Sequence, residues 1–159
     1  MPEGNSSEKA KAIFDVLCQS FDKKNWPYEK DEQGFTVHCK VQGADLPMKL
    51  TFKIVPDMQL IVLLSLLPFN IPKNKRTEMA IAVSAVNNKI INGAFDYNII
   101  TGNLFFKITN SFIDSTIDEE VLDYLFVCSV STIDDYNDKF FMLTNGMMSF
   151  EQFMSSLNE

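Results

Sequence analysis

The chain has one histidine, His38, and histidine is the side chain most often used as a general base near neutral pH. It lies in a segment where polar and apolar residues alternate, directly before Cys39. Because successive side chains of a strand point to opposite faces, Cys39 cannot use His38 as its base or share a metal ion with it. The pattern therefore predicts an exposed strand histidine, and we assign no catalytic residue.

Asp134, Asp135 and Asp138 have the DDxxD spacing with which helical prenyl-transferring enzymes hold magnesium and diphosphate. Those enzymes need a second metal motif and a large helical pocket, and the sequence indicates neither. Asp134 and Asp138 are four residues apart, so they are neighbours on one face of a helix. The spacing favours a solvated helix face and no metal site. The alternative is a small-ligand binder or metal-dependent enzyme with a cleft beside this C-terminal helix.

Other classes of site are disfavoured by motif and charge. The glycine patterns that cradle phosphates are absent from the sequence, so we expect no nucleotide cofactor. The net charge is −7, and Arg76 is the only arginine. A chain without a stripe of lysine and arginine has little with which to bind phosphates, so we expect no nucleic-acid partner.

Length and composition predict one domain over residues 1–159, since 159 residues with 46% hydrophobic residues are enough for one core. The N-terminus lacks the charged and apolar regions of a secretory signal, and no apolar run is long enough to cross a bilayer. Three scattered cysteines, Cys18, Cys39 and Cys128, fit neither a disulfide framework nor a zinc site. We therefore expect a cytoplasmic protein with no membrane contact and no cofactor.

Hydrophobic periodicity predicts an α+β fold in which helices pack on an antiparallel sheet, in the order α-β-β-β-(β)-α-β-β-α-α. Asn5 and Glu8 have the spacing of a capping box before the first helix. The predicted helices cover residues 6–24, 74–92, 118–144 and 150–157. The predicted strands cover residues 28–31, 35–42, 48–54, 60–67, 95–100 and 104–109, with a hairpin turn at residues 101–103.

The strand at residues 60–67 is unlike the strands before it, because both of its faces are apolar apart from Ser65. Burial of one large aliphatic side chain contributes about 1.5–3 kcal/mol, so both faces should be covered. Two predicted helices supply one cover. The C-terminal tail around Phe150 and Phe153, a second subunit or a bound segment could supply the other, and we favour the second subunit. The possible interaction surface consists of Ile61, Leu63, Leu67 and Phe105.

The order of the elements resembles the fold of type III secretion chaperones. Within that fold the sequence is similar to the YbjN-like proteins, a family described as bacterial regulators of sensory transduction. The resemblance covers about the C-terminal half of the chain. It is carried by Arg76, by the block Val86-Asn87-Asn88, by the runs at residues 93–97 and 102–107, and by a helix that ends near Asp135-Tyr136. Lys89-Ile90-Ile91 stands where the family often has basic and tryptophan-rich residues.

The resemblance provides no catalytic residue. It implies a non-enzymatic homodimer, because chaperones of this fold dimerise and bind extended segments of other proteins along their sheet and helices. We therefore expect a regulatory or chaperone-like protein that binds a protein or peptide segment.

Overall fold

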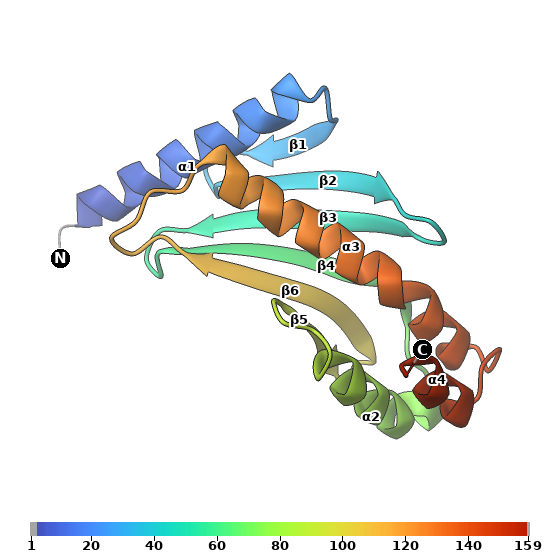
Figure 1. Ribbon diagram of the computed structural model, residues 1–159. Coiled ribbons are helices and arrows are strands. Elements are labelled where there is room, and N and C mark those ends of the chain that lie inside the picture. The colour runs from blue at the N-terminus through green and yellow to red at the C-terminus, as the bar shows by residue number, and fades with distance from the viewer. Residues whose placement is uncertain (1–2, 159) are drawn as a thin grey trace.

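The computed structural model describes the backbone of residues 3–158 and the side chains of residues 5–158. Over these residues the chain forms four α-helices, one short 3-10 helix and six strands (Figure 1). The helices are α1 (Glu3–Lys23), the 3-10 helix η1 (Lys73–Lys75), α2 (Arg76–Asn87), α3 (Glu119–Thr144) and α4 (Phe150–Ser156). The strands are β1 (Tyr28–Asp31), β2 (Thr36–Gln42), β3 (Pro47–Val55), β4 (Leu60–Asn70), β5 (Ala94–Asn98) and β6 (Asn103–Ser111).

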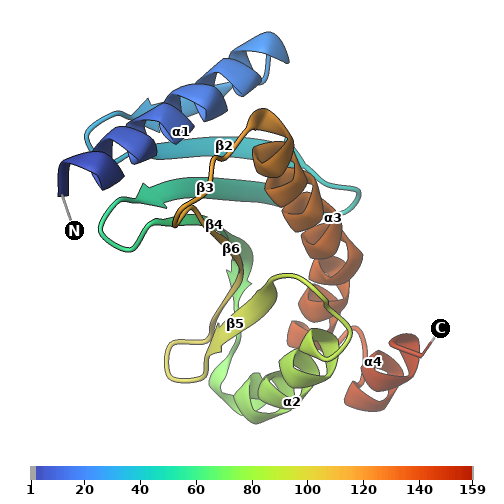
Figure 2. The ribbon, with the colours of Figure 1, turned by 60° about the vertical axis from the view of Figure 1, so that its left-hand side comes forward.

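All six strands form one antiparallel sheet in the order β1-β2-β3-β4-β6-β5. The first four strands follow each other as a meander, and the hairpin of β5 and β6 adds to the far side of β4. The register between β4 and β6 shifts between Leu66 and Asn70, and such an irregularity bends a strand. Figure 2 shows the resulting bend, with β5 and α2 lying below the upper part of the sheet.

The helices lie on one face of the sheet. α1 and α3 cross the strands on the same side, and α2 packs beside β5 at the far end (Figures 1 and 2). One continuous cluster of buried apolar side chains fills the space between helices and sheet. Among the described residues, no helix has the length and hydropathy required to cross a bilayer.

The predicted fold class and element order are confirmed. The second helix ends at Asn87, not at residue 92. After Asn87 the N–H groups of Lys89 and Ile90 donate to the carbonyl oxygens of Val86 and Asn87, three residues back, so the α-helical pattern does not continue. The first helix already includes Asn5, so the predicted capping box is wrong. The strand predicted to reach residue 100 ends at Asn98, whose side chain accepts hydrogen bonds from the backbone of the next turn.

Arg76 fixes the turn between β5 and β6 to the start of α2. Its guanidinium donates to the carbonyl oxygens of Ile71, Ile100 and Thr101. Gly102 approaches the same place with φ +78°, and a Cβ there would lie 2.4 Å from the carbonyl oxygen of Ile71. Arg76 and Gly102 are among the residues that carry the resemblance to the YbjN-like proteins. Their role here is structural, because they hold the hairpin against the end of β4.

Candidate functional site

Three of the four predicted interaction residues lie on the helix-covered face. Ile61, Leu63 and Leu67 are 0%, 1% and 3% exposed and belong to the core. The structure corrects the prediction for these three residues, because a run that is apolar on both faces does not reveal which face the helices cover. Phe105 is half-buried on the opposite face, where it pairs with Leu66. The uncovered face of β4 is made by the even-numbered residues.

We call this uncovered side of the sheet the open face. Along β4 it presents Leu60, Val62, Leu64 and Leu66, which form an aliphatic stripe beside Phe105 of β6. The first three are half-buried, and Leu66 is 57% exposed. The aliphatic stripe is therefore covered in part by its neighbours on the sheet, and no helix of the described part of the chain lies over it.

Lysines flank the aliphatic stripe. Lys40 of β2 lies directly opposite Lys49 of β3, and Lys53 pairs with Val62 of the stripe. Like charges that face each other across two strands repel, yet these three lysines form no ion pair with any described residue. On the far side, Lys107 is paired with Asp96. The open face thus has an apolar centre and, beside it, a positive side whose three lysines have no ion-pair partner among the described residues.

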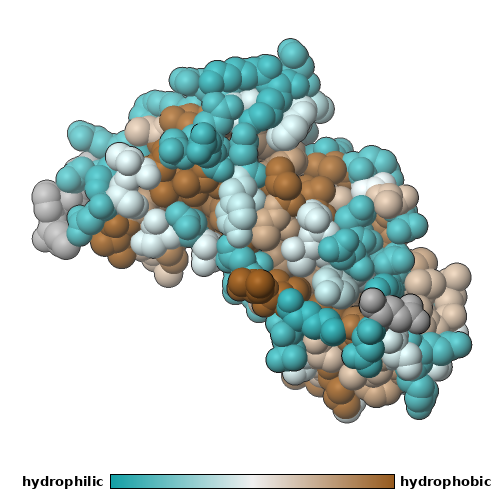
Figure 3. Space-filling view, in the orientation of Figure 1, coloured by the Kyte–Doolittle hydropathy of each residue, from teal (hydrophilic) through white to brown (hydrophobic). Residues whose placement is uncertain are grey.

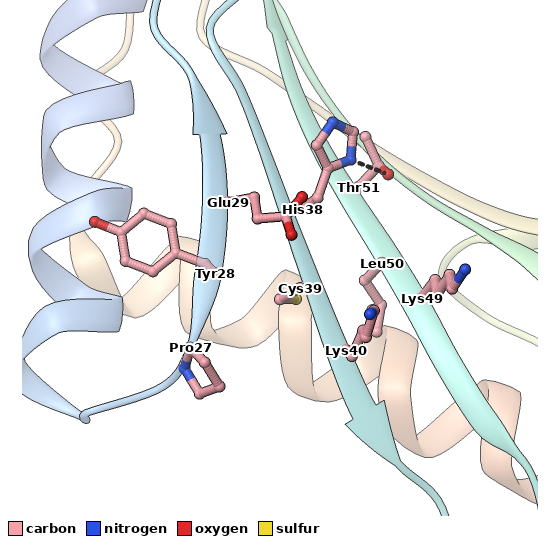
Figure 4. A pocket seen from close by; sticks show the side chains of 9 residues that line it. All are labelled: Pro27, Tyr28, Glu29, His38, Cys39, Lys40, Lys49, Leu50 and Thr51. Carbon is pink, nitrogen blue, oxygen red and sulfur yellow. Dashed lines mark hydrogen bonds between the residues drawn. The ribbon is translucent and has the colours of Figure 1, made fainter.

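The positive side ends at an incomplete edge of the sheet. β1 pairs with β2 only from Asp31 to Tyr28, which lies opposite Cys39. Pro27 precedes β1 and has no N–H to donate, so the pairing stops there. Residues 40–42 of β2 continue without β1 beside them, as Figure 4 shows. We call residues 40–42 the β2 edge.

A hollow adjoins the β2 edge on each side of the sheet. The first, about 550 Å³, includes Glu29, His38, Lys40, Lys49 and Thr51, whose side chains belong to the open face (Figure 4). The second, about 330 Å³, is lined mainly on the helix side by Phe21, Trp26, Val41 and Phe126. The indole of Trp26 is 37% exposed, and its ring centre lies 4.9 Å from that of Phe126. The first hollow carries two lysines and one glutamate among its lining residues, and the second is lined on the helix side mainly by aromatic rings.

The His38 prediction is confirmed. His38 is exposed and its Nδ1 lies 2.9 Å from Oγ1 of Thr51, whereas Cys39 is buried on the other face (Figure 4). Burial raises the pKa of the Cys39 thiol to about 11. Burial also raises the pKa of the Cys18 thiol, against a hydrogen bond with Tyr28 that lowers it. Both thiols therefore remain protonated in the folded protein at neutral pH.

The raised pKa predicts a loss of stability in alkali. The folded protein keeps the Cys39 proton up to about pH 11, whereas the unfolded chain releases it near pH 9. The contribution of the protonated thiol to the free energy of unfolding is therefore complete below pH 9 and is lost as the pH rises toward 11. We expect wild-type protein to lose about 2 kcal/mol more than Cys39→Val between pH 9 and pH 11. Urea unfolding of both proteins at several pH values measures the difference, and parallel curves would contradict the assignment.

The aspartates of α3 do not gather into a site. Asp134 accepts a hydrogen bond from the backbone N–H of Ala44, at 2.9 Å, and so ties the turn between β2 and β3 to α3. Asn137 is buried, and neither atom of its amide has a hydrogen-bond partner among the described residues. Within the described part of the chain, no three His, Cys, Asp or Glu side chains are placed to hold a metal ion.

The C-terminal tail does not cover the open face. Phe153 of α4 is fully buried against Phe140 of α3, with ring centres 5.6 Å apart, and α4 also contacts α2. Three candidates were considered as the cover of the second face of β4. With the C-terminal tail excluded, a second subunit and a bound segment remain.

Comparisons with known proteins agree with this fold. The E. coli protein YbjN, whose crystal structure is described as that of "a putative transcription regulator", is 12% identical, with a TM-score of 0.55 over 79% of this chain and 91% of that one. The HopA1–SchA chaperone–effector complex contains a chain that is 12% identical, with a TM-score of 0.56 over 83% of this chain and 97% of that one. These identities establish similarity of fold alone.

No protein with a curated description matches the chain. The model of the YbjN family, "Putative bacterial sensory transduction regulator", matches residues 14–142. That match extends from α1 almost to the end of α3 and includes every strand of the sheet. The chain therefore belongs to the YbjN family.

Proposed function

We propose that this protein is a non-enzymatic regulatory or chaperone-like protein of the cytoplasm, which works as a homodimer and binds a segment of another protein. Membership of the YbjN family and the fold shared with a chain of a chaperone–effector complex support the general role. We also treat residues 1–159 as one domain, because one cluster of buried residues includes side chains from α1 to α4.

The observation that carries the proposal is the open face. A two-layer protein needs to cover only one face of its sheet, and the other is usually polar. Here the central strand has aliphatic residues on the open face as well, and Leu66 and Phe105 lie side by side on it. An aliphatic stripe rimmed by charged residues is typical of an interaction site.

We assign the open face to a second copy of this chain. Such an isologous contact uses the same surface of both subunits, so the aliphatic stripe of one subunit would cover that of the other. Lys40 and Lys49 lie on one side of this face, and the ion pair of Asp96 with Lys107 lies on the other. In a two-fold arrangement the aliphatic stripes make the contact, and these charged groups lie at its rim.

The Leu66→Asp variant tests this assignment. We expect wild-type protein to dimerise and the variant to dimerise about 100-fold more weakly or not at all, because an unpaired carboxylate buried in an interface costs several kcal/mol. Analytical ultracentrifugation over a wide concentration range measures both proteins. Ile81→Asp on α2 is the matched control, since Ile81 is similarly exposed but lies on a helix. A wild-type protein that stays monomeric at all concentrations would contradict the homodimer.

A further inference from the structure

We propose that the β2 edge binds an extended segment of a partner protein as an added strand, and that this segment alternates acidic with large apolar side chains. The inference deepens the proposed function, because it rests on the binding of another protein and names the chemistry of the segment. Its backbone contacts lie at the edge of the sheet, and it uses the lysine side of the open face but not the aliphatic stripe, so the two proposals can fail separately.

The two edges of the sheet differ in how their backbone is satisfied. On β5, the side chain of Asn87 accepts from the N–H of Phe95 at 2.8 Å and donates to its carbonyl at 2.9 Å. This amide takes the position that a further strand would occupy. At the β2 edge the pairing with β1 stops at Cys39, and no described strand continues it. Unpaired strand edges of this kind accept an added strand through backbone hydrogen bonds.

The two hollows lie where an added strand would place its side chains. Successive residues of a strand point to opposite faces, so such a segment would direct alternate side chains toward Val41 and toward Lys40. On the helix side, Trp26 and Phe126 line the hollow beside Val41. Hydrophobic surface over β2 beside α3 is visible in Figure 3. An aromatic or large aliphatic side chain fits this hollow.

The hollow on the open face selects for negative charge. Lys40 and Lys49 face each other across β2 and β3, and neither has a carboxylate partner among the described residues. Glu29 also lines this hollow, on β1, where it lies opposite His38 in the strand register. An aspartate or glutamate above Lys40 would relieve the repulsion between the two lysines, whereas a lysine would increase it. The same lysines oppose the addition of an uncharged, aggregation-prone strand.

Fluorescence anisotropy with a labelled synthetic peptide tests the proposal directly. The peptide alternates aspartate with phenylalanine or leucine, and the intact chain is the titrant. Three comparison peptides have the same length: a shuffled sequence of the same composition, a version with lysine for aspartate, and a version N-methylated at alternate backbone nitrogens. We expect only the peptide that alternates aspartate with phenylalanine or leucine to bind well. Each comparison peptide loses the alternation, the negative charge or the backbone hydrogen bonds.

Protein variants locate the site. Lys40→Glu together with Lys49→Glu should weaken binding about 100-fold, and Trp26→Ala about 10-fold or more. The matched control is the double variant Lys73→Glu with Lys89→Glu, which changes the net charge by the same amount at two exposed lysines outside the sheet. Its effect should be at most about twofold, as expected for a change in overall charge alone.

The outcomes separate the two proposals. Peptide binding that Leu66→Asp leaves unchanged supports the edge site, whatever the oligomeric state. Equal binding of the shuffled or N-methylated peptide would overturn the added strand. Equal effects of the Lys40/Lys49 double change and the Lys73/Lys89 double change would overturn the assigned position. If the Lys40 change alters self-association and no peptide binds, the β2 edge is a contact between copies of the chain and the proposal is wrong.

Discussion

Phe95→Ala is expected to lower the free energy of unfolding by about 3–5 kcal/mol, the usual range for removal of a fully buried phenylalanine ring. Phe95 is 2% exposed, and its ring centre lies 5.3 Å from Phe106, 6.1 Å from Tyr136 and 5.1 Å from Phe140. It therefore joins the β5–β6 hairpin to α3. Urea unfolding followed by circular dichroism measures the loss.

Ile91→Ala is the control for this variant, because Ile91 lies only four residues before Phe95, in the connection that leads into β5, and is 103% exposed. It should change the free energy of unfolding by no more than about 0.5 kcal/mol. A Phe95→Ala protein that unfolds at the wild-type urea concentration would show that the hairpin is not held to α3 as described.

Asn87→Ala is expected to lower the free energy of unfolding by about 2–3 kcal/mol. The side chain of Asn87 satisfies both backbone groups of Phe95, a buried residue on an edge strand. Alanine leaves a donor and an acceptor without partners, and each unsatisfied buried group costs about 1–3 kcal/mol, less where water can enter. Thermal and urea unfolding give the difference, and hydrogen exchange at the amide of Phe95 should become faster.

Asn88→Ala is the matched control, since Asn88 is exposed and adjacent. Asn87→Asp tests the hydrogen bond that the side chain of Asn87 donates to the carbonyl oxygen of Phe95. A charged aspartate keeps an acceptor for the N–H of Phe95 but places a second oxygen against its carbonyl, whereas a protonated one restores the donor. The Asp variant should therefore approach wild-type stability as the pH falls below about 4. Equal losses in the Asn88 and Asn87 variants would refute the pairing role.

The sequence was sufficient to predict the architecture because the local signals agree with it. Alternation identified β2 and β3, helical spacing identified α3, and Ser149 with Gln152 forms the capping box at α4. Helix and strand ends were less accurate where side chains decide them. Asn98 ends β5 by bonding to its own turn, and composition does not reveal which asparagine will do this.

The interaction surface was harder to predict. The odd-numbered and the even-numbered residues of β4 are both mainly apolar, so hydrophobic periodicity could not assign Ile61 or Leu66 to a face of the sheet. Only the packing of α1 and α3 decides it. The β2 edge depends on where the pairing with β1 stops, which is a relation between two segments. Pro27 was the one local signal for it, since proline cannot continue a strand pairing.

The position of β6 next to β4 has a consequence for how the chain folds. Neighbouring strands from β1 to β4 pair through short connections, and so do β5 and β6, but Leu60 of β4 meets Ser111 of β6 with α2 and β5 between them. Closing that long loop costs more chain entropy than any hairpin. We therefore expect the joining of two locally formed halves to limit the folding rate. Changes in the β4–β6 pairing should slow folding, whereas changes in the turns between β1 and β4 should mainly speed unfolding.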